Sequence, residues 1–294
     1  MYTVRYECGG RLGNCVFPYT LCVIYEMFFG KKYVIEPQPD EFVITDELFK
    51  TIYSEESFKN FEFIVPQRNI CFKGYFQYDY IFYVFKDKIV NYIKSHTHEI
   101  LSPSNGIQFY NTVLYHDYMP DFILNDNDIV FHVRLEDALY PDRATTPLLL
   151  QIHHYKSVIE NFRKQFQLLP GTGKIYWILN KPSMPLEVLH LEFLLSELGG
   201  IYEPHSIEED LCIMRKSKNL ICSHSTFSWI AAAFSTSPQN VFIPEFSTIL
   251  NYPHEKFTYL HEKSVVYPYP RYTSGELEND LLEWKKSHIN TLPQ

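Results

Sequence analysis

A short apolar run in the middle of the chain, Ile129–Val133, constrains the fold more than any other stretch. Aliphatic and aromatic residues surround one histidine there, which predicts a buried β-strand. Arg134 follows at once, with Glu136 and Asp137 close behind, so the apolar run ends in charge. Open parallel sheets covered by helices place their ligand sites outside the carboxyl ends of such strands.

The end of this strand predicts a ligand site built on two side chains. Because strand side chains alternate between faces, His132 and Arg134 are expected on the same face. A guanidinium fork suits a phosphate better than a lysine does, and an imidazole adds a hydrogen-bonding ring. On these residues alone a structural interpretation stays open, in which Arg134 and Asp137 form a salt bridge at the rim of the sheet.

The rest of the chain alternates in the same way and predicts an α/β fold with parallel sheets and helices on both faces. Expected strands are Tyr2–Tyr6, Lys32–Ile35, Ile175–Leu179, Asn219–Ser223 and Val241–Pro244, and expected helices are Val16–Phe29, Leu148–Phe166, Leu186–Leu198 and Glu276–His288. At 294 residues the chain exceeds a usual single domain, so we expect two, joined around Pro103–Asp128.

Composition narrows the classes of protein. The formal charge of -9 argues against a general nucleic-acid binder, which needs a positive face. Six scattered cysteines without a C-x-x-C pair argue against a zinc ribbon and favour small buried hydrophobes in a reducing compartment. The apolar stretch Cys15–Gly30 contains Pro18 and Glu26, and is too short and interrupted to span a bilayer. With no signal peptide recognisable, a soluble, cytoplasmic protein is expected.

A glycine-rich turn, Gly9–Asn14, stands between the first expected strand and the first expected helix. That arrangement points main-chain N–H groups and a helix N-terminus at an anion. Arg11 adds positive charge, and the amide of Asn14 can both donate and accept. The turn lacks the Lys-Ser/Thr of a P-loop, and a purely structural tight turn is the alternative.

A second turn, Ser223–Trp229, follows the strand Asn219–Ser223 and is rich in hydroxyl groups. Hydroxyls and main-chain N–H groups at a strand-to-helix turn can hold a phosphate, whereas an ordinary Ser/Thr N-cap is the simpler interpretation. The turn is not G-x-S-x-G, which argues against a hydrolase nucleophile. The pair Asp126 and Asp128 matches the metal-binding D-x-D of some glycosyltransferases, but it precedes a strand and is better explained as a polar turn.

Together these stretches resemble the α-1,2-fucosyltransferase family of glycosyltransferases. Gly10–Tyr19 is similar to the family start G-G/R-L-G-N-Q-x-F-Q-Y, His132–Asp137 to H-V-R-R-G-D, Ser223–Ile230 to S-N-S-S-F-S-W-W, and Gly74–Gln77 to the G-Y-F/W-Q of bacterial members. Order and spacing agree from residue 9 to about residue 245.

The resemblance implies a GT-B-type fold, in which two Rossmann-like parallel-sheet domains face each other across a cleft. It implies an acceptor-side domain over residues 1–120, a GDP-sugar-binding domain over 121–268, and a C-terminal helix within 269–294 that packs back on the first domain. The implied reaction is inverting transfer of fucose from GDP-fucose to a glycan hydroxyl, usually O2 of galactose, with no metal and no other cofactor required.

Roles follow at the matching positions. Arg134 would bind the β-phosphate, His132 would lie near the guanine or ribose, and Asp210 would accept from guanine N1–H and the exocyclic amine. The remaining residues expected around the donor are Ser225, Thr226 and Phe227 beside the diphosphate, and Gly10, Arg11, Gly13 and Asn14 from the first domain. For the proton of the acceptor hydroxyl, Asp137 is the first candidate, followed by Asp142 and Glu136.

Departures from the family pattern leave two alternatives open. Leu135 stands where the family has a second arginine and Glu136 where it has glycine, while Cys15, Pro18 and His224 replace amide side chains. One alternative is a transferase that uses another GDP-sugar or makes another linkage. The other is a catalytically decayed protein that binds a GDP-sugar or a glycan, which the changes at 135 and 136 favour.

Overall fold

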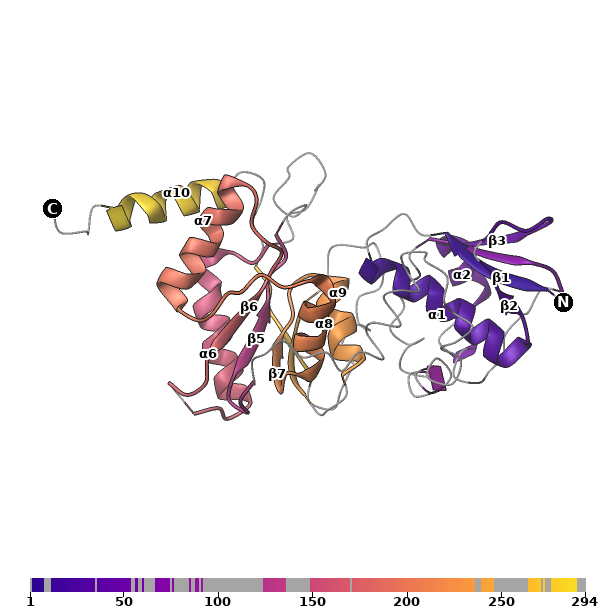
Figure 1. Cartoon of the computed structure of the whole chain (residues 1–294), viewed down its shortest axis with the longest axis horizontal. Helices are drawn as coiled ribbons and strands as arrows, with labels where there is room; N and C mark the ends of the chain where they lie inside the picture. Colours follow the sequence, from indigo (N-terminus) through magenta and orange to yellow (C-terminus); the bar gives the residue numbers. More distant parts are fainter. Residues whose placement is uncertain are drawn as a thin grey trace. The chain divides into compact units, whose positions relative to one another are not determined.

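The chain forms two compact units, Met1–Asp117 and Tyr118–Gln294, in a computed structural model of the whole sequence (Figure 1). Each unit is built on a parallel β-sheet, which confirms the predicted α/β class with two parallel sheets. The residues that the structure describes are 2–7, 12–34, 36–53, 56–57, 60, 67–74, 76, 85, 88–89, 91, 124–135, 149–169, 171–235, 239–245, 264–270, 272 and 276–289, with the backbone alone for 12–15 and 289.

The first unit contains a sheet of four strands in the order β2-β1-β4-β3, all parallel. The strands are β1 (Thr3–Glu7), β2 (Lys32–Tyr33), β3 (Phe42–Thr45) and β4 (Ile70–Lys73). Helices α1 (Leu12–Phe29) and α2 (Asp46–Ile52) pack aromatic residues against one face, where the Tyr25 and Phe49 rings lie 5.2 and 6.5 Å from the ring of Phe72. Helix α1 begins at Leu12, earlier than the expected Val16, so Gly13 and Asn14 belong to its first turn.

The second unit contains a sheet of five strands in the order β6-β5-β7-β8-β9, again all parallel. The strands are β5 (Ile129–His132), β6 (Ile175–Ile178), β7 (Asn219–Ile221), β8 (Asn240–Pro244) and β9 (Ser264–Tyr267). Ile201 adds a parallel bridge to Tyr176 outside β6. The chain therefore winds outward from β5 in one direction and then, starting at β7, in the other, which is the doubly wound order.

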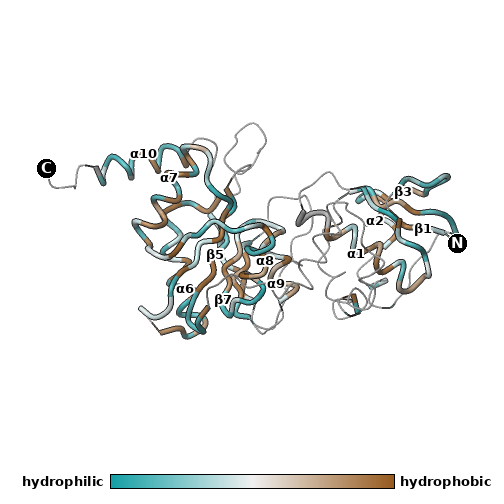
Figure 2. Tube along the Cα trace, viewed as in Figure 1, coloured by the Kyte–Doolittle hydropathy of each residue, from teal (hydrophilic) through white to brown (hydrophobic). Residues whose placement is uncertain are grey.

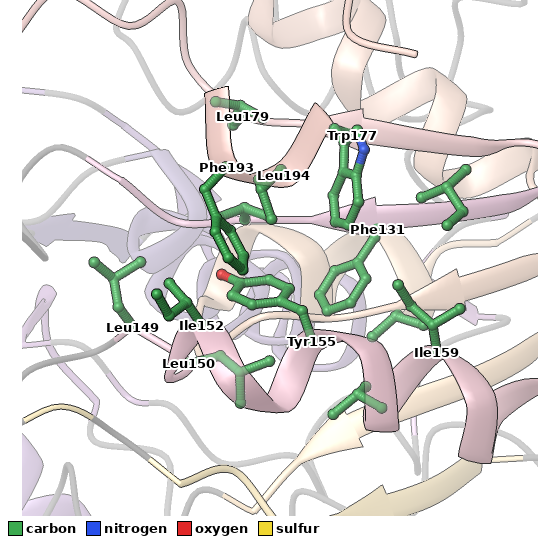
Figure 3. Close-up of a cluster of buried hydrophobic side chains, with 14 of the residues drawn as sticks. Phe131, Leu149, Leu150, Ile152, Tyr155, Ile159, Trp177, Leu179, Phe193 and Leu194 are labelled. Carbon is green, nitrogen blue, oxygen red and sulfur yellow. The ribbon is translucent and has the colours of Figure 1, made fainter. Parts of the chain in front are cut away.

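Helices cover both faces of this second sheet, α6 (Tyr155–Gln165) and α7 (Pro185–Phe193) on one side and α8 (Ile207–Lys216) and α9 (Thr226–Ala233) on the other (Figure 1). On the first side Phe131 lies 5.4 Å from both Tyr155 and Trp177, ring centroid to centroid, at the centre of the core (Figure 3). Since neighbouring residues point to opposite faces, His132 faces α8 and α9, where its ring meets Phe227.

The C-terminal helix α10 (Glu276–Ile289) packs on α7 of the second unit, and its expected packing on the first domain stays a prediction. Its Trp284 ring lies 5.5 Å from that of Phe193, and the Trp284 indole N–H donates to Glu197 at 2.8 Å. Leu277 and Leu281 are buried in the core of this unit, whereas much of the helix is hydrophilic (Figure 2). An amphipathic helix buries its apolar face on the nearest apolar surface, which here is α7.

The described part of the second unit also contains a 3₁₀ turn η2 (Ile152–His154) before α6 and a π-helical turn η3 (Leu194–Leu198) after α7. Among the helices described here, none is long and apolar enough to cross a membrane.

Candidate functional site

His132, Arg134 and the Ser-rich turn meet where the winding of the second sheet reverses. Strands β5 and β7 are neighbours, but the chain leaves β5 toward β6 and leaves β7 toward β8 on the opposite side. Connections that diverge in this way open a crevice outside the carboxyl ends of the two strands, where doubly wound sheets bind ligands. His132 ends β5, and the Ser-rich turn follows β7.

His132 is held in place by the turn after β7. Its Nδ1 lies 2.7 Å from Oγ of Ser223, and both side chains are buried. The Phe227 ring lies 5.6 Å away and packs on the imidazole. Burial, and to a smaller extent the positive charge of Arg134, lower the pKa of His132 to about 3, so the ring is neutral at physiological pH.

Arg134 is half-buried and reaches across the switch from β5 to the turn after β7. Its Nη1 donates to the main-chain oxygen of His224 at 3.3 Å. This contact fixes the guanidinium beside His132, and its positive charge adds to the effect of burial in lowering the pKa of that imidazole. The two side chains of the predicted His-x-Arg pair are therefore both anchored on the same turn.

The Ser-rich turn itself is fixed from several directions. Ser225 is the N-cap of α9, and its Oγ accepts from the N–H of Phe227 at 3.2 Å. The Ser228 hydroxyl donates back to the main-chain oxygen of Ser225 at 3.2 Å, and the Tyr267 hydroxyl donates to that of Cys222 at 2.8 Å. The N-cap interpretation is thus correct for Ser225, but a hydroxyl that accepts one N–H still carries a proton for an anion at the N-terminus of α9.

Asp210 lies on α8, the helix that covers the same face of the sheet as His132. The helix opens with a capping box, in which the Ser206 N–H donates to Glu209 at 2.6 Å and Ser206 Oγ accepts from the Glu209 N–H at 3.2 Å. Burial first, and then the charge of Glu209, raise the pKa of Asp210 to about 7. His205 Nδ1 stands 3.5 Å from its Oδ1.

For the other predicted residues, a place in this site stays a prediction. Gly13 and Asn14 lie in the first turn of α1, which follows β1 in the first unit. Gly10, Arg11, Glu136, Asp137 and Asp142 lie outside the described residues.

Two residues of the site are missing from the sequence-based prediction, Ser223 as the partner of His132 and His205 beside Asp210. The signal for Ser223 is its position at the end of the predicted strand Asn219–Ser223, in the same sheet as the strand of His132. His205 precedes the capping box, and only the fold brings it to Asp210.

The acidic pair before β5 is structural. The Asp128 carboxylate accepts from the N–H groups of Asn125 and Lys174, both at 2.7 Å, and Asp126 forms an ion pair with Lys218 at 2.6 Å. The polar-turn interpretation therefore describes these residues. Within the described part of the chain, no group of three or more His, Cys, Asp or Glu side chains could hold a metal ion.

Comparisons with known proteins yield little. No protein-family model and no curated protein matches the chain. One solved structure, a Listeria monocytogenes protein assigned as a UDP-N-acetylglucosamine 2-epimerase, aligns over 83% of this chain and 79% of its own length with 10% identity and a TM-score of 0.32. That score and that identity are too low to indicate a shared fold or function.

Proposed function

We propose that the chain is an inverting glycosyltransferase of GT-B type that moves fucose from GDP-fucose to a glycan hydroxyl, with O2 of galactose as the expected acceptor. In this proposal the second unit binds the nucleotide and the first contributes the acceptor side, with the glycine-rich turn of residues 9–14 approaching the donor. The observation that carries the proposal is the anchoring of His132 and Arg134 on one turn at the switch point between β5 and β7.

The chemistry of the reaction suits these groups. As the bond from the sugar C1 to the diphosphate oxygen breaks, negative charge grows on the β-phosphate. Arg134, the first N–H groups of α9 and the hydroxyls of Ser225 and Thr226 can stabilise that charge in place, without a metal ion. Each preorganised donor of this kind commonly raises the rate by a factor of roughly 10²–10³.

The base in the donor is recognised at Asp210 in this proposal. A carboxylate is acceptor-only, and guanine offers N1–H and an exocyclic amine as adjacent donors. Two parallel hydrogen bonds from guanine favour the ionised form and offset the cost of burying it. Because the pKa of Asp210 stands near 7 in the free protein, nucleotide binding would draw the proton off the carboxyl.

Inversion requires attack of the acceptor oxygen on the face of C1 opposite the diphosphate. The new bond forms from that oxygen, and its proton passes to a carboxylate base. Asp137 is the first candidate by its place after the central strand, and Asp142 and Glu136 follow.

One observation favours a second candidate function. Leu135, which stands where the resembling family has its second arginine, is buried and packs in the apolar core of the unit. A leucine there supplies no positive charge to a diphosphate. A protein that binds a GDP-sugar without turning it over would need less charge stabilisation than an enzyme.

A donor panel separates these candidates. The protein is incubated with GDP-fucose, GDP-mannose or UDP-galactose and a set of galactosides in the presence of EDTA, and products are read by mass spectrometry. Transfer from GDP-fucose alone supports the proposal, and transfer from another GDP-sugar supports the alternative donor. GDP-fucose binding without transfer or hydrolysis across the panel would favour the binding protein.

A further inference from the structure

The contact between Ser223 and His132 both positions the imidazole and bears on which of its nitrogens is protonated. The two heavy atoms, Oγ and Nδ1, are 2.7 Å apart, and the two residues are 91 positions apart in sequence. Either atom could be the donor in this bond. Which one donates decides which nitrogen of the imidazole is protonated, and hence what the other nitrogen offers to a ligand.

The number of protons available resolves the choice. A hydroxyl has one proton, and within the described part of the chain the Ser223 hydroxyl has no hydrogen bond besides that with His132. If the imidazole donated from Nδ1, both the proton of the buried hydroxyl and the lone pair of Nε2 would lack a partner among the described residues, whereas a donating hydroxyl leaves only the Nε2–H without one. If the hydroxyl donates, its proton and the Nδ1 lone pair are both satisfied.

The imidazole must then carry its single proton on Nε2. It is neutral because burial and the neighbouring Arg134 hold its pKa near 3. No hydrogen bond to Nε2 occurs among the described residues, so this N–H is available to a bound molecule.

We propose that Ser223 is a positioning residue whose hydroxyl donates to Nδ1 of His132, holds the ring as the Nε2–H tautomer, and so presents a donor to an acceptor atom of the bound nucleotide. This inference rests on the proposed function for the identity of the ligand. The tautomer itself depends only on contacts within the free protein.

The surroundings make the Ser223 hydroxyl a separable part of the site. The main-chain oxygen of Ser223 accepts from the Ser225 N–H at 2.8 Å and from the Ser228 hydroxyl at 3.4 Å. These bonds hold the backbone of the turn and do not involve the Ser223 side chain. A Ser223→Ala change therefore removes the partner of His132 while leaving the turn in place, and Ser223→Thr restores a hydroxyl.

The test reads the tautomer by nitrogen-15 NMR of the imidazole in the full chain at neutral pH without nucleotide. The His132 signal is identified by its loss in His132→Gln. We expect a fixed Nε2–H form in the wild type and in Ser223→Thr, and a mixture of tautomers in Ser223→Ala. A wild-type ring protonated on Nδ1, or a tautomer unaffected by Ser223→Ala, would overturn the proposal.

A second readout is calorimetric affinity for GDP. Ser223→Ala is expected to weaken it about 10-fold, the factor for one hydrogen bond of ordinary net strength, and Ser223→Thr to restore it. Ser217→Ala is the matched control, because it removes a buried hydroxyl that donates to Met214 at 2.8 Å, after the end of α8. Equal GDP affinity in the wild type and Ser223→Ala would overturn the positioning role. A Ser223-dependent tautomer in a protein that binds no GDP would instead contradict the proposed function and support the assignment of the tautomer.

Discussion

The first strand of each sheet is associated with an arginine, and the two arginines are used in opposite ways. Arg5 of β1 donates from Nε and Nη2 to Glu41 at 2.6 and 2.7 Å, and from Nη2 to Glu7 at 2.7 Å. Arg134, after β5, donates to a main-chain carbonyl at 3.3 Å. The same side chain thus takes part in an ion-pair cluster in one unit and is oriented by a backbone dipole in the other.

The pKa shifts show the consequence. Hydrogen bonds from Arg5 lower the pKa of both Glu7 and Glu41, and Glu41 raises that of Arg5 above its ordinary value, so this cluster satisfies its own charges. In the second unit burial, and to a smaller extent Arg134, lower the pKa of His132, so the neighbour of this arginine is a neutral ring. The arginine of the first unit thus belongs to a charge cluster within its own sheet, whereas Arg134 is fixed on the turn after β7, where the winding of the second sheet reverses.

The largest expected effect is on stability in the first unit. Arg5→Met should lower the free energy of unfolding by about 3–5 kcal/mol, because it leaves the nearly buried Glu41 carboxylate without its partner. Chemical denaturation measures this loss. Lys73→Met is the control, since Lys73 is exposed and its Nζ forms a longer ion pair with Glu7, at 3.6 Å. An equally small change in both variants would mean that the Arg5 cluster is not structural.

Arg134→Ala should lower turnover and leave stability nearly unchanged. Turnover should fall by roughly 10²–10³ while the free energy of unfolding changes by less than about 1 kcal/mol, because the arginine acts on charge that grows during the reaction. Arg163→Ala is the matched control, an arginine of the same unit that donates to the main-chain oxygen of Thr172 at 2.6 Å. Wild-type turnover in Arg134→Ala would remove the contrast between the two arginines.

Asp210 extends the comparison to a carboxylate that has no arginine partner among the described residues. With a pKa of about 7 it is protonated below that pH, so GDP affinity should fall by up to about tenfold per pH unit on acidification and level off above it. Asp210→Asn should weaken GDP binding by roughly 10–100-fold and abolish this pH dependence, because an amide is a poorer acceptor and does not titrate. Calorimetry from pH 5.5 to 8 measures both.

The stability of the free protein should fall as pH rises, whereas its GDP affinity increases. The folded-state pKa of Asp210 lies above the ordinary carboxyl value, so its burial costs stability as pH rises toward about 7. Asp210→Asn should therefore raise the melting temperature at neutral pH. A fall in melting temperature would indicate that this carboxylate stabilises the fold.

His190 offers the smallest effect and separates the core of the second unit from its site. It is fully buried on α7 against the Tyr155 ring, at 5.7 Å, and burial lowers its pKa to about 4. A base with a lowered folded-state pKa contributes stability above its unfolded value of about 6.5 and loses it as pH falls. From pH 7 to 5 the wild type should lose roughly 2 kcal/mol more than His190→Leu, by denaturation at both pH values. Equal losses of unfolding free energy in the two proteins would mean that groups other than His190 cause the acid sensitivity.

The alternation of apolar runs with helical segments predicts the central strands well, because β5, β6 and β7 are buried on both faces and are largely apolar. Strand β3 is different. Its four residues, Phe42–Thr45, are too few to show a period, so the sequence suggests an irregular region there, and pairing with β4 makes it a strand. The polarity of His190 suggests that this residue lies on the surface of its helix, but the packing of α7 buries it.

The site is predictable in part for a similar reason. His132 and the Ser-rich turn each follow a recognisable strand, but their contact depends on β5 and β7 being neighbours. Strand order is decided by the crossovers, which local sequence does not encode. The C-terminal helix has an apolar face in the sequence, and only the fold shows that α7 is the surface it covers.

The central claim is that the second unit contains a guanine-nucleotide site. The most direct measurement is calorimetric titration of the wild-type protein with GDP and GDP-fucose, and in parallel with UDP and UDP-galactose, all with EDTA present. The account predicts micromolar binding that is selective for guanine and independent of divalent metal. Binding without preference for guanine, or binding only after a divalent cation is restored, would contradict it.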